Sequence, residues 1–380
     1  MNNRDLLSTL ALLAALSMVA CSGDDGPNVD RDARSLRECA AAGQALTAVW
    51  SVGNGHGAIT AMSVDGTTVA LASADGSIKT WSLTTEIKDE VVGPAAGGIY
   101  GGEFEGEAPA FSALGFAEGQ RLIAGDTLGS VGLFELNGET VSAMAAGETG
   151  IVGVAARPGS LEIALATEAF AGEIGVWNPD TNELFAPMQT ILWGVRDLGY
   201  SSDGARLVVA GDWYGVPAFE LWDSANLESS RVAWVAPMAA GLGGEAAEIV
   251  AIALTPDGRH ALVGGASPLE PEAGGFLALL DLEYALAAEA DGSWVDDGEV
   301  IVARTAGAAM AAITDLAIAP DGESYAVASA DGSVRLMLAG DELDSGVELP
   351  VSARFVAYTD DGARLLTSGD DGELQLWACE

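Results

Sequence analysis

The chain has 380 residues, of which 49% are hydrophobic, and its 56 acidic and 16 basic side chains give a formal net charge of −40. This apolar content can build a large core, so the acidity indicates a charged surface and excludes a chain that is disordered throughout. An acidic surface repels phosphate backbones, and no cluster of lysine and arginine offsets it, which argues against nucleic acid as a partner.

The first twenty residues have the features of a secretory signal. One arginine precedes an apolar segment from Leu6 to Ala20, which as a helix would be about 22 Å long. The hydrocarbon core of a bilayer is about 30 Å thick, so the segment is too short to span it and matches the apolar part of a signal peptide. We therefore expect residues 1–20 to be cleaved from the mature chain.

The residues around the expected cleavage site resemble the lipobox of bacterial lipoproteins. Met18-Val19-Ala20-Cys21 matches that motif, although leucine usually stands where this chain has Met18. The resemblance implies that Cys21 is lipidated and anchors the protein to the bacterial cell envelope. By the sorting rule of enteric lipoproteins, Ser22 directly after the cysteine implies the outer membrane. The alternative is an ordinary signal peptide with an incidental cysteine.

Residues 21–43 contain Gly, Asp, Pro and Ala without the alternation of a strand. This composition predicts a flexible tether between the lipid anchor and the folded part of the chain. A flexible segment of about 20 residues spans about 25 Å, which is enough to hold a domain away from the lipid headgroups.

A repeated unit begins after the tether. Its clearest copy is "GHGAITAMSVDGTTVALASADGSIKTW" at residues 55–81, which predicts three strands joined by a Gly turn and an Asp-Gly turn and ending in Trp81. The first-strand pattern recurs from Phe111, Ile151, Val195, Ile249, Ile313 and Ala353. The place of Trp81 is taken by Phe134, Trp177, Trp222, Leu280, Met337 and Trp377. Seven units with a period of about 40 to 45 residues and some insertions are therefore predicted.

These units resemble WD40 repeats. The resemblance rests on "GH" at 55–56, "SADGSIKTW" at 73–81, "TPDG" at 255–258, "APDG" at 319–322 and "SADGSVRL" at 329–336. It implies an all-β fold in which residues 44–380 form a seven-bladed WD40-like β-propeller, with four-stranded sheets around a channel. Candidate fourth strands lie at 140–147, 183–189, 231–237, 299–305 and 346–351.

The two ends of the repeat region each leave an unpaired strand, at 45–52 and at 373–378. In WD40 rings the N-terminal strand completes the last sheet, which removes two open edges. Antiparallel pairing of these strands would bring Cys379 towards Cys39, and a lipoprotein lies outside the reducing cytosol, so we expect a disulfide between them. Two free thiols are the alternative.

The sequence offers few residues for catalysis. It has two histidines, His56 and His260, and the resemblance places them on opposite faces of the ring. By the same resemblance, His56 joins Ser73, Asp75 and Trp81 in a structural hydrogen-bond network. The chain contains no G-x-S-x-G, H-E-x-x-H or paired C-x-x-C motif, and its acidic turns lack the spacing of a calcium loop. We therefore expect no catalytic residue, metal site or cofactor.

Insertions gather on the face that carries the connections between blades and the turns between second and third strands. They place aromatic and acidic residues on that face: Tyr100, Phe104, Phe170, Asp212, Trp213, Tyr214, Glu270 and Glu272. Aromatic residues are favoured at the centres of interfaces, and the surrounding acid would suit a basic protein or peptide. The alternative is that some of these aromatic residues fold back over their own sheets.

These observations predict a non-enzymatic, protein-binding scaffold at the bacterial envelope. We expect a monomer that touches the membrane only through its lipid anchor. The rival prediction is a propeller enzyme, lactonase-like or quinoprotein-like, with its site at the channel mouth. Its candidate residues are Arg196, Asp197, Asp315 and Arg354, which interrupt first strands that otherwise carry mainly small residues there.

Overall fold

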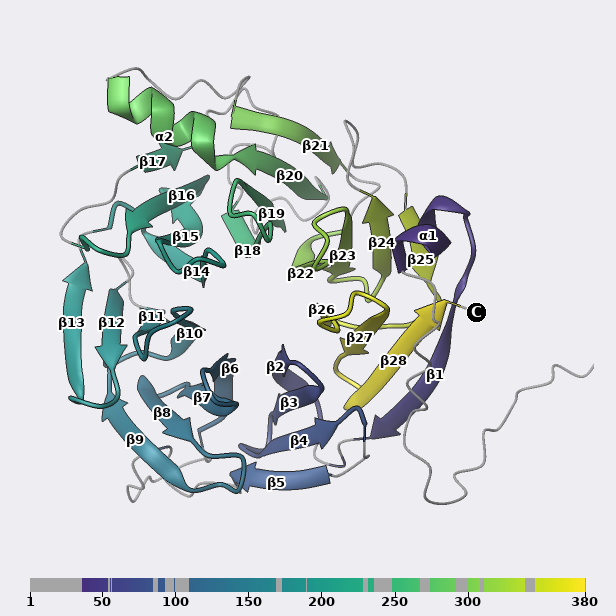
Figure 1. Ribbon diagram of the computed structural model, residues 1–380, viewed down its shortest axis with the longest axis horizontal. Helices are drawn as coiled ribbons and strands as arrows, with labels where there is room; N and C mark the ends of the chain where they lie inside the picture. Colours follow the sequence, from purple (N-terminus) through teal and green to yellow (C-terminus); the bar gives the residue numbers. More distant parts are fainter. Residues whose placement is uncertain are drawn as a thin grey trace, which may run out of the picture.

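A computed structural model describes residues 36–53, 55, 57–84, 88–92, 99, 109–168, 173–188, 190–227, 232–235, 248–266, 274–291, 300–307, 311–338 and 346–379. The strands in these ranges form seven antiparallel sheets of four strands each. The sheets stand around a common centre, so that the chain runs once around a closed ring (Figure 1). The predicted all-β, seven-bladed propeller is confirmed.

Each sheet is one blade, and its strands run outwards from the centre of the ring. Blade 1 is β2 (Ile59–Asp65), β3 (Thr68–Ser73), β4 (Ile78–Ser82) and β5 (Lys88–Val92). Blade 2 is β6 (Phe111–Ala117), β7 (Arg121–Asp126), β8 (Ser130–Phe134) and β9 (Thr140–Ala145). Blade 3 is β10 (Ile151–Ala156), β11 (Ile163–Thr167), β12 (Ile174–Asn178) and β13 (Glu183–Met188). Blade 4 is β14 (Gly194–Tyr200), β15 (Arg206–Trp213), β16 (Val216–Asp223) and β17 (Val232–Val235).

The remaining blades follow the same order. Blade 5 is β18 (Glu248–Leu254), β19 (His260–Ala266), β20 (Gly275–Asp281) and β21 (Ile301–Gly307). Blade 6 is β22 (Ile313–Ile318), β23 (Ser324–Ser329), β24 (Val334–Leu338) and β25 (Gly346–Leu349). Blade 7 is β26 (Phe355–Tyr358), β27 (Arg364–Ser368), β28 (Glu373–Cys379) and, on its outer side, β1 (Leu46–Gly53).

The core lies between neighbouring blades. The second strands β7 and β23 are buried almost throughout, because blades cover them on both faces, whereas the inner strand β6 alternates buried and half-buried residues. The residues that occupy the Trp81 position are buried in every blade: Trp81, Phe134, Trp177, Trp222, Leu280, Met337 and Trp377. The large apolar residue that ends each third strand therefore fills the space between two blades.

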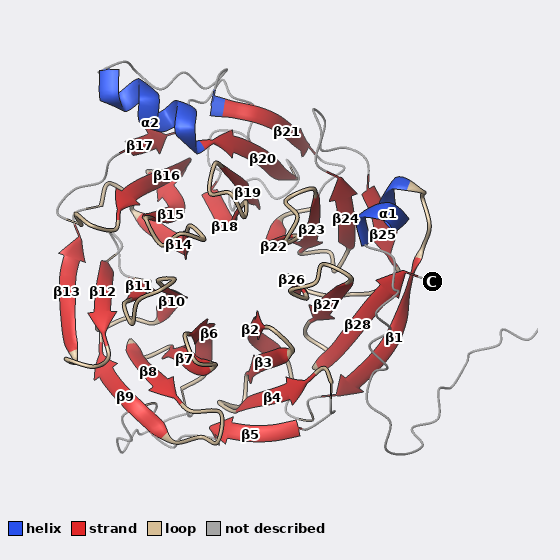
Figure 2. Ribbon diagram, in the orientation of Figure 1, coloured by secondary structure: helices blue, strands red, loops and turns tan. Residues whose placement is uncertain are grey.

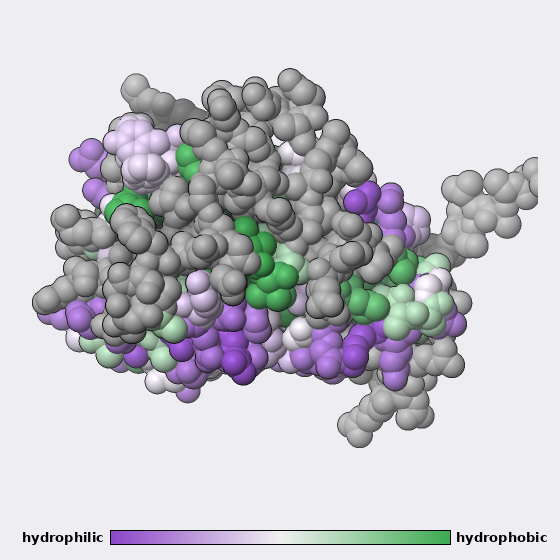
Figure 3. All heavy atoms as spheres, turned by 90° about the horizontal axis from the view of Figure 1, so that it is seen from above, coloured by the Kyte–Doolittle hydropathy of each residue, from purple (hydrophilic) through white to green (hydrophobic). Residues whose placement is uncertain are grey.

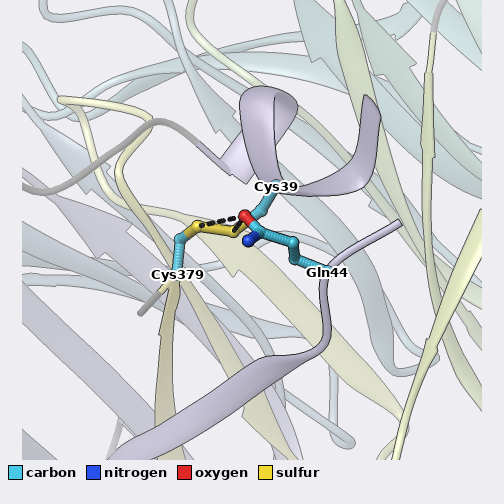
Figure 4. Close-up of a disulfide and its surroundings, with 3 residues drawn as sticks. All are labelled: Cys39, Gln44 and Cys379. Atoms are coloured by element: carbon cyan, nitrogen blue, oxygen red, sulfur yellow. Dashed lines mark hydrogen bonds between the residues drawn. A yellow bond between two sulfur atoms is a disulfide. The ribbon is translucent and has the colours of Figure 1, made fainter. Parts of the chain in front are cut away.

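The ring is closed by the first and last strands. β1 pairs antiparallel with β28, from Leu46 opposite Cys379 to Gly53 opposite Glu373. A disulfide joins Cys39 to Cys379, with a Cα–Cα distance of 6.0 Å and a sequence separation of 340 residues. The Gln44 side chain lies beside this bond (Figure 4). The closure therefore combines a backbone ladder with a covalent bond at the same end of β28.

Helix α1 (Leu36–Ala41) lies where the sequence predicted a tether. Leu36 and Cys39 are buried in a cluster with residues of blades 6 and 7, and α1 contacts β24 and β28. Gly43 ends the helix with a φ of 64°, and Gln44 N–H donates to the Cys39 carbonyl. The fold therefore begins before residue 44, because these two apolar side chains are buried against the ring.

A second helix, α2 (Leu282–Asp291), follows β20 on the outside of blade 5 (Figure 2). The Asp281 carboxylate caps it by accepting a 2.9 Å hydrogen bond from Tyr284 N–H. Neither helix, nor any other in the described ranges, has the length and apolar character needed to cross a bilayer. Hydrophilic residues gather along one edge of the ring when it is viewed onto its rim (Figure 3), consistent with the acidic surface predicted from the net charge.

Candidate functional site

The β15–β16 hairpin presents two exposed aromatic residues at its tip. Trp213 is 40% exposed and Tyr214 is 58% exposed. Trp213 pairs with Val216, so only Tyr214 and Gly215 form the turn, with φ values of 52° and 76°. Positive φ at both central residues is the signature of a type I′ hairpin turn. The sequence predicted a grown loop at 211–217, but the structure extends the two strands almost to the tip.

A third aromatic residue, Trp193, lies beside this tip. Its ring contacts that of Tyr214, and the rings of Trp213 and Tyr214 meet edge to face with centroids 5.0 Å apart. Trp193 N–H donates to the Asp212 carbonyl at 2.8 Å, and the Asp212 carboxylate accepts Gly215 N–H at 2.8 Å. We call Trp193, Trp213 and Tyr214 the aromatic tip. Asp212 therefore connects the turn to the strand connection that carries Trp193.

The base of the aromatic tip is held by a buried carboxylate. Glu220 on β16 is 0% exposed and accepts hydrogen bonds from Thr190 Oγ1 at 2.6 Å and from Ile191 N–H at 3.1 Å. Gly194 and Gly211 lie so close that a Cβ on Gly211 would overlap the Gly194 carbonyl oxygen. The connection before β14 is therefore fixed to β15 and β16 by hydrogen bonds and close backbone packing.

Charge beside the tip is partly paired. Arg196 on β14 forms an ion pair with Glu248 on β18, with a nitrogen–oxygen distance of 2.9 Å. The Arg196 side chain is 39% exposed and the Glu248 side chain 17%. This pair joins blades 4 and 5 next to Asp212.

Several residues predicted for this face lie outside the described residues: Tyr100, Phe104, Phe170, Glu270 and Glu272. The described members of the predicted set are Asp212, Trp213 and Tyr214, which the β15–β16 hairpin brings together. Trp193 was not predicted, because it lies in a connection between blades where no periodic pattern marks it. Trp213 and Tyr214 do not fold back over their own sheet, since both are exposed.

The other predicted sites are placed only in part. Cys21, the expected lipidation site, and His56 lie outside the described residues. Ser73 and Trp81 are buried, and the Asp75 carboxylate accepts Ser77 N–H at 3.0 Å and the Ser77 hydroxyl at 2.6 Å. Asp75 therefore closes the β3–β4 turn, whereas a network that includes His56 stays a prediction.

The four residues of the rival enzyme prediction are engaged in structural contacts. Asp197 on β14 accepts N–H groups of Leu198 and Ile252, and Asp315 on β22 accepts N–H groups of Leu316 and Val356, all at 2.8 to 2.9 Å. Because Ile252 and Val356 belong to the following blades, each carboxyl links two blades. Arg196 is paired with Glu248, and Arg354 is paired with Asp370 at 3.2 Å. Among the described residues no group of three His, Cys, Asp or Glu side chains could hold a metal ion.

The two linking carboxyls have raised pKa values. Burial raises the pKa of Asp197 to about 6 and that of Asp315 to about 7, against the lowering effect of the backbone N–H donors. The charge of Asp197 raises the pKa of Asp315 further. Desolvation of the charged form therefore outweighs the hydrogen bonds that favour it.

We expect Asp315 to make the fold less stable as the pH rises. The folded protein holds this proton more tightly than the unfolded chain does, so stability is greatest below the unfolded pKa of 3.8 and falls as the pH rises through the folded pKa of about 7. Between about pH 5 and about pH 8 the loss should be about 2 kcal/mol. Urea denaturation of Asp315→Asn should give a flatter pH profile, although asparagine offers one acceptor oxygen for two N–H donors and should lower stability at every pH.

The control for this experiment is Asp180→Asn, which makes the same charge change at an exposed turn. It should leave the pH profile of the wild type unchanged. Equal slopes for the wild type and Asp315→Asn would contradict the prediction.

Comparison with known proteins bears on the fold. The sequence model of the WD40 family, described as "WD domain, G-beta repeat", matches residues 48–82 and 304–336. A chain of the solved structure described as "Crystal Structure of Mitotic Checkpoint Complex" superposes with a TM-score of 0.67 at 14% sequence identity, covering 100% of this chain and 99% of that chain. No curated protein sequence matches the chain. The two repeat matches support the WD40 family, and the fold of the whole chain is that of a seven-bladed WD40 propeller.

Proposed function

We propose that this protein is a non-enzymatic scaffold that binds a protein or peptide through the aromatic tip. WD40 propellers in general support protein interaction. The observation that carries the proposal is Tyr214, which is 58% exposed and holds a φ of 52°. A tyrosine in the left-handed region costs free energy that glycine or asparagine there would avoid, and such strain gathers at functional sites.

The chemistry of the tip favours a basic partner. The faces of Trp and Tyr rings attract Lys and Arg cations, and Asp212 adds a carboxylate directly beside them. The net charge of −40 would attract a cationic partner over a longer range at low salt. The aromatic rings would supply most of the affinity, and the acidic surroundings would favour a basic sequence over an acidic one.

The proposal extends to location. The signal-like segment and the lipobox-like residues at 18–21 favour a mature protein that is lipid-anchored through Cys21 at the bacterial cell envelope, with the outer membrane favoured by Ser22. A tether would then hold the propeller away from the membrane. Mass spectrometry of detergent-extracted protein should find Cys21 acylated at the mature N-terminus. An unmodified N-terminus at another residue would overturn the anchor and leave the binding proposal untouched.

The binding proposal is tested by crosslinked pull-down from envelope extracts. The wild type is compared with Trp213→Ala/Tyr214→Ala, and the control is Val302→Ala, which changes an exposed apolar residue on the outer strand of blade 5. A partner lost from the aromatic-tip variant and retained by the control supports the proposal. An unchanged set of captured proteins would overturn it.

Tyr214→Asn separates strain from binding. Asparagine is favoured before glycine in a type I′ turn, so this variant should be more stable than the wild type by about 0.5 to 1 kcal/mol. The same change removes an exposed ring from the aromatic tip and should weaken partner capture. Urea denaturation and the pull-down together check both halves. A variant that is less stable than the wild type would contradict the strain, and undiminished capture would contradict the role of Tyr214.

A further inference from the structure

A groove lies between blades 3 and 4, at the opposite end of β16 from the aromatic tip. Its volume is about 460 Å³, and its walls include Glu162, Val176, Asn178, Glu183, Phe185 and Leu227. Val216 begins β16 at the tip and Asp223 ends it beside the groove, so about 23 Å of strand separates the two surfaces. This volume is within the range of cavities that hold small ligands or short peptide segments.

The floor of the groove is polar and already satisfied. Arg157 donates from Nε to the Gly204 carbonyl at 2.9 Å and from Nη1 to the Glu162 carboxylate at 2.6 Å. The same Nη1 donates to the Ser224 carbonyl at 3.3 Å. Arg157 therefore links blade 3 to blade 4 and neutralises Glu162. The remaining carboxylate on the groove wall is that of the exposed Glu183.

The outer wall of the groove is apolar and exposed. Phe185 on β13 is 52% exposed, although the Leu184 beside it packs into the core between blades 2 and 3. Val176 is buried and Leu227 packs against the core cluster of blades 3 and 4. The turn before β13 is held in place, because Trp177 Nε1 donates to Asn182 Oδ1 at 3.1 Å. An exposed phenylalanine therefore stands on a fixed turn beside a polar cavity.

We propose that this groove, called here the blade 3/4 groove, binds an extended peptide segment that carries an arginine or lysine next to an aliphatic residue. The aliphatic side chain covers Phe185, and the cation pairs with Glu183, whose charge no other group in the groove offsets. The segment binds through its side chains, because Pro187 in β13 has no N–H to offer an added strand. This surface is separate from the aromatic tip and does not depend on it.

The test uses the peptide acetyl-Ala-Arg-Leu-Ala-amide, titrated into isotopically labelled protein and followed by backbone amide signals. We expect signals of β13 and of the residues after β16 to shift, with weak affinity. Phe185→Ala should weaken binding about tenfold, because it removes the apolar contact. Glu183→Gln should weaken it about threefold at low salt, because the ion pair is exposed. The control Val141→Ala, an exposed apolar residue on the outer strand of blade 2, should bind as the wild type does.

Three results would overturn the proposal. The first is equal binding of the matched peptide with glutamine in place of arginine, and the second is full binding by both groove variants. The third is a change of the groove signals when the protein alone is diluted, which would assign the groove to a second copy of the chain. Trp213→Ala/Tyr214→Ala should still bind the peptide. Loss of binding there, with signals shifting at the aromatic tip, would place the peptide at that site and also overturn the groove.

Discussion

Replacing both Cys39 and Cys379 with serine is expected to lower the free energy of unfolding by about 5 kcal/mol. The bond joins residues 340 positions apart, so it restricts nearly the whole unfolded chain. It also fixes α1 against the end of β28, where Leu36 and Cys39 are buried. Urea denaturation should show the loss as a lower transition midpoint. Wild-type protein unfolded in the presence of a reductant should reach the same midpoint as the variant.

The matched control is Cys21→Ser, which removes the other cysteine of the chain and leaves the ring closure intact. Measured without lipid, it should unfold as the wild type does. Peptide mapping without reductant should recover the Cys39 peptide joined to the Cys379 peptide. Two alkylatable thiols at these positions, or a double serine variant of unchanged stability, would contradict the prediction.

Trp222→Ala is expected to lower the free energy of unfolding by about 3 to 5 kcal/mol. Trp222 ends the third strand of blade 4 and is 0% exposed. It packs in the cluster between blades 3 and 4 with Val209, Leu207 and Ala164, so truncation leaves a cavity that a rigid sheet can fill only partly. Chemical denaturation measures the loss, and Trp222→Phe should retain most of the stability because it keeps an aromatic ring in place.

Trp213→Ala provides a control of the same chemistry on the same hairpin. Trp213 is 40% exposed at the tip, so its truncation should cost much less than that of Trp222. The comparison also shows whether the aromatic-tip variant used in the pull-down is folded. Equal losses for the two alanine variants would contradict the assignment of Trp222 to the core and Trp213 to the surface.

The ring could be predicted from sequence because its signals are local and repeated. The stretch 55–81 contains its own turns and strand alternation, and each later copy keeps a large apolar residue at the Trp81 position. All seven of those residues are buried. The partners for the first strand were also predictable, because an unpaired strand at each end leaves only one closed arrangement.

The candidate site was less predictable because it depends on contacts between distant residues. Glu220 holds the connection before β14 through Thr190, thirty residues earlier in the chain. The extension of β15 and β16 to Trp213 and Val216 was missed because Tyr-Gly is a rare dipeptide for a type I′ turn, which usually has Asn or Asp before glycine. A strand-to-strand pairing through the hairpin was thus interpreted as a loop.

The carboxyls of Asp197 and Asp315 illustrate the same limit. The sequence placed both near the channel mouth, where carboxyl groups could serve catalysis. Their actual partners are the N–H groups of Ile252 and Val356 on the next blades, which come into reach only when the ring forms. Helix α2 is different, since its Ala-, Leu- and Glu-rich sequence after the capping Asp281 carried a local signal that a search for repeated strands passed over.

The position of the disulfide determines how the propeller would respond to mechanical tension. A pull on the chain ahead of Cys39 reaches the covalent bond before it reaches β1, and the bond carries the load to Cys379 at the end of β28. In its sheet, β28 lies between β1 and β27, so a pull on it must shear two backbone ladders together. The outer strand β1, which a pull from its own end could peel away, bears none of that load.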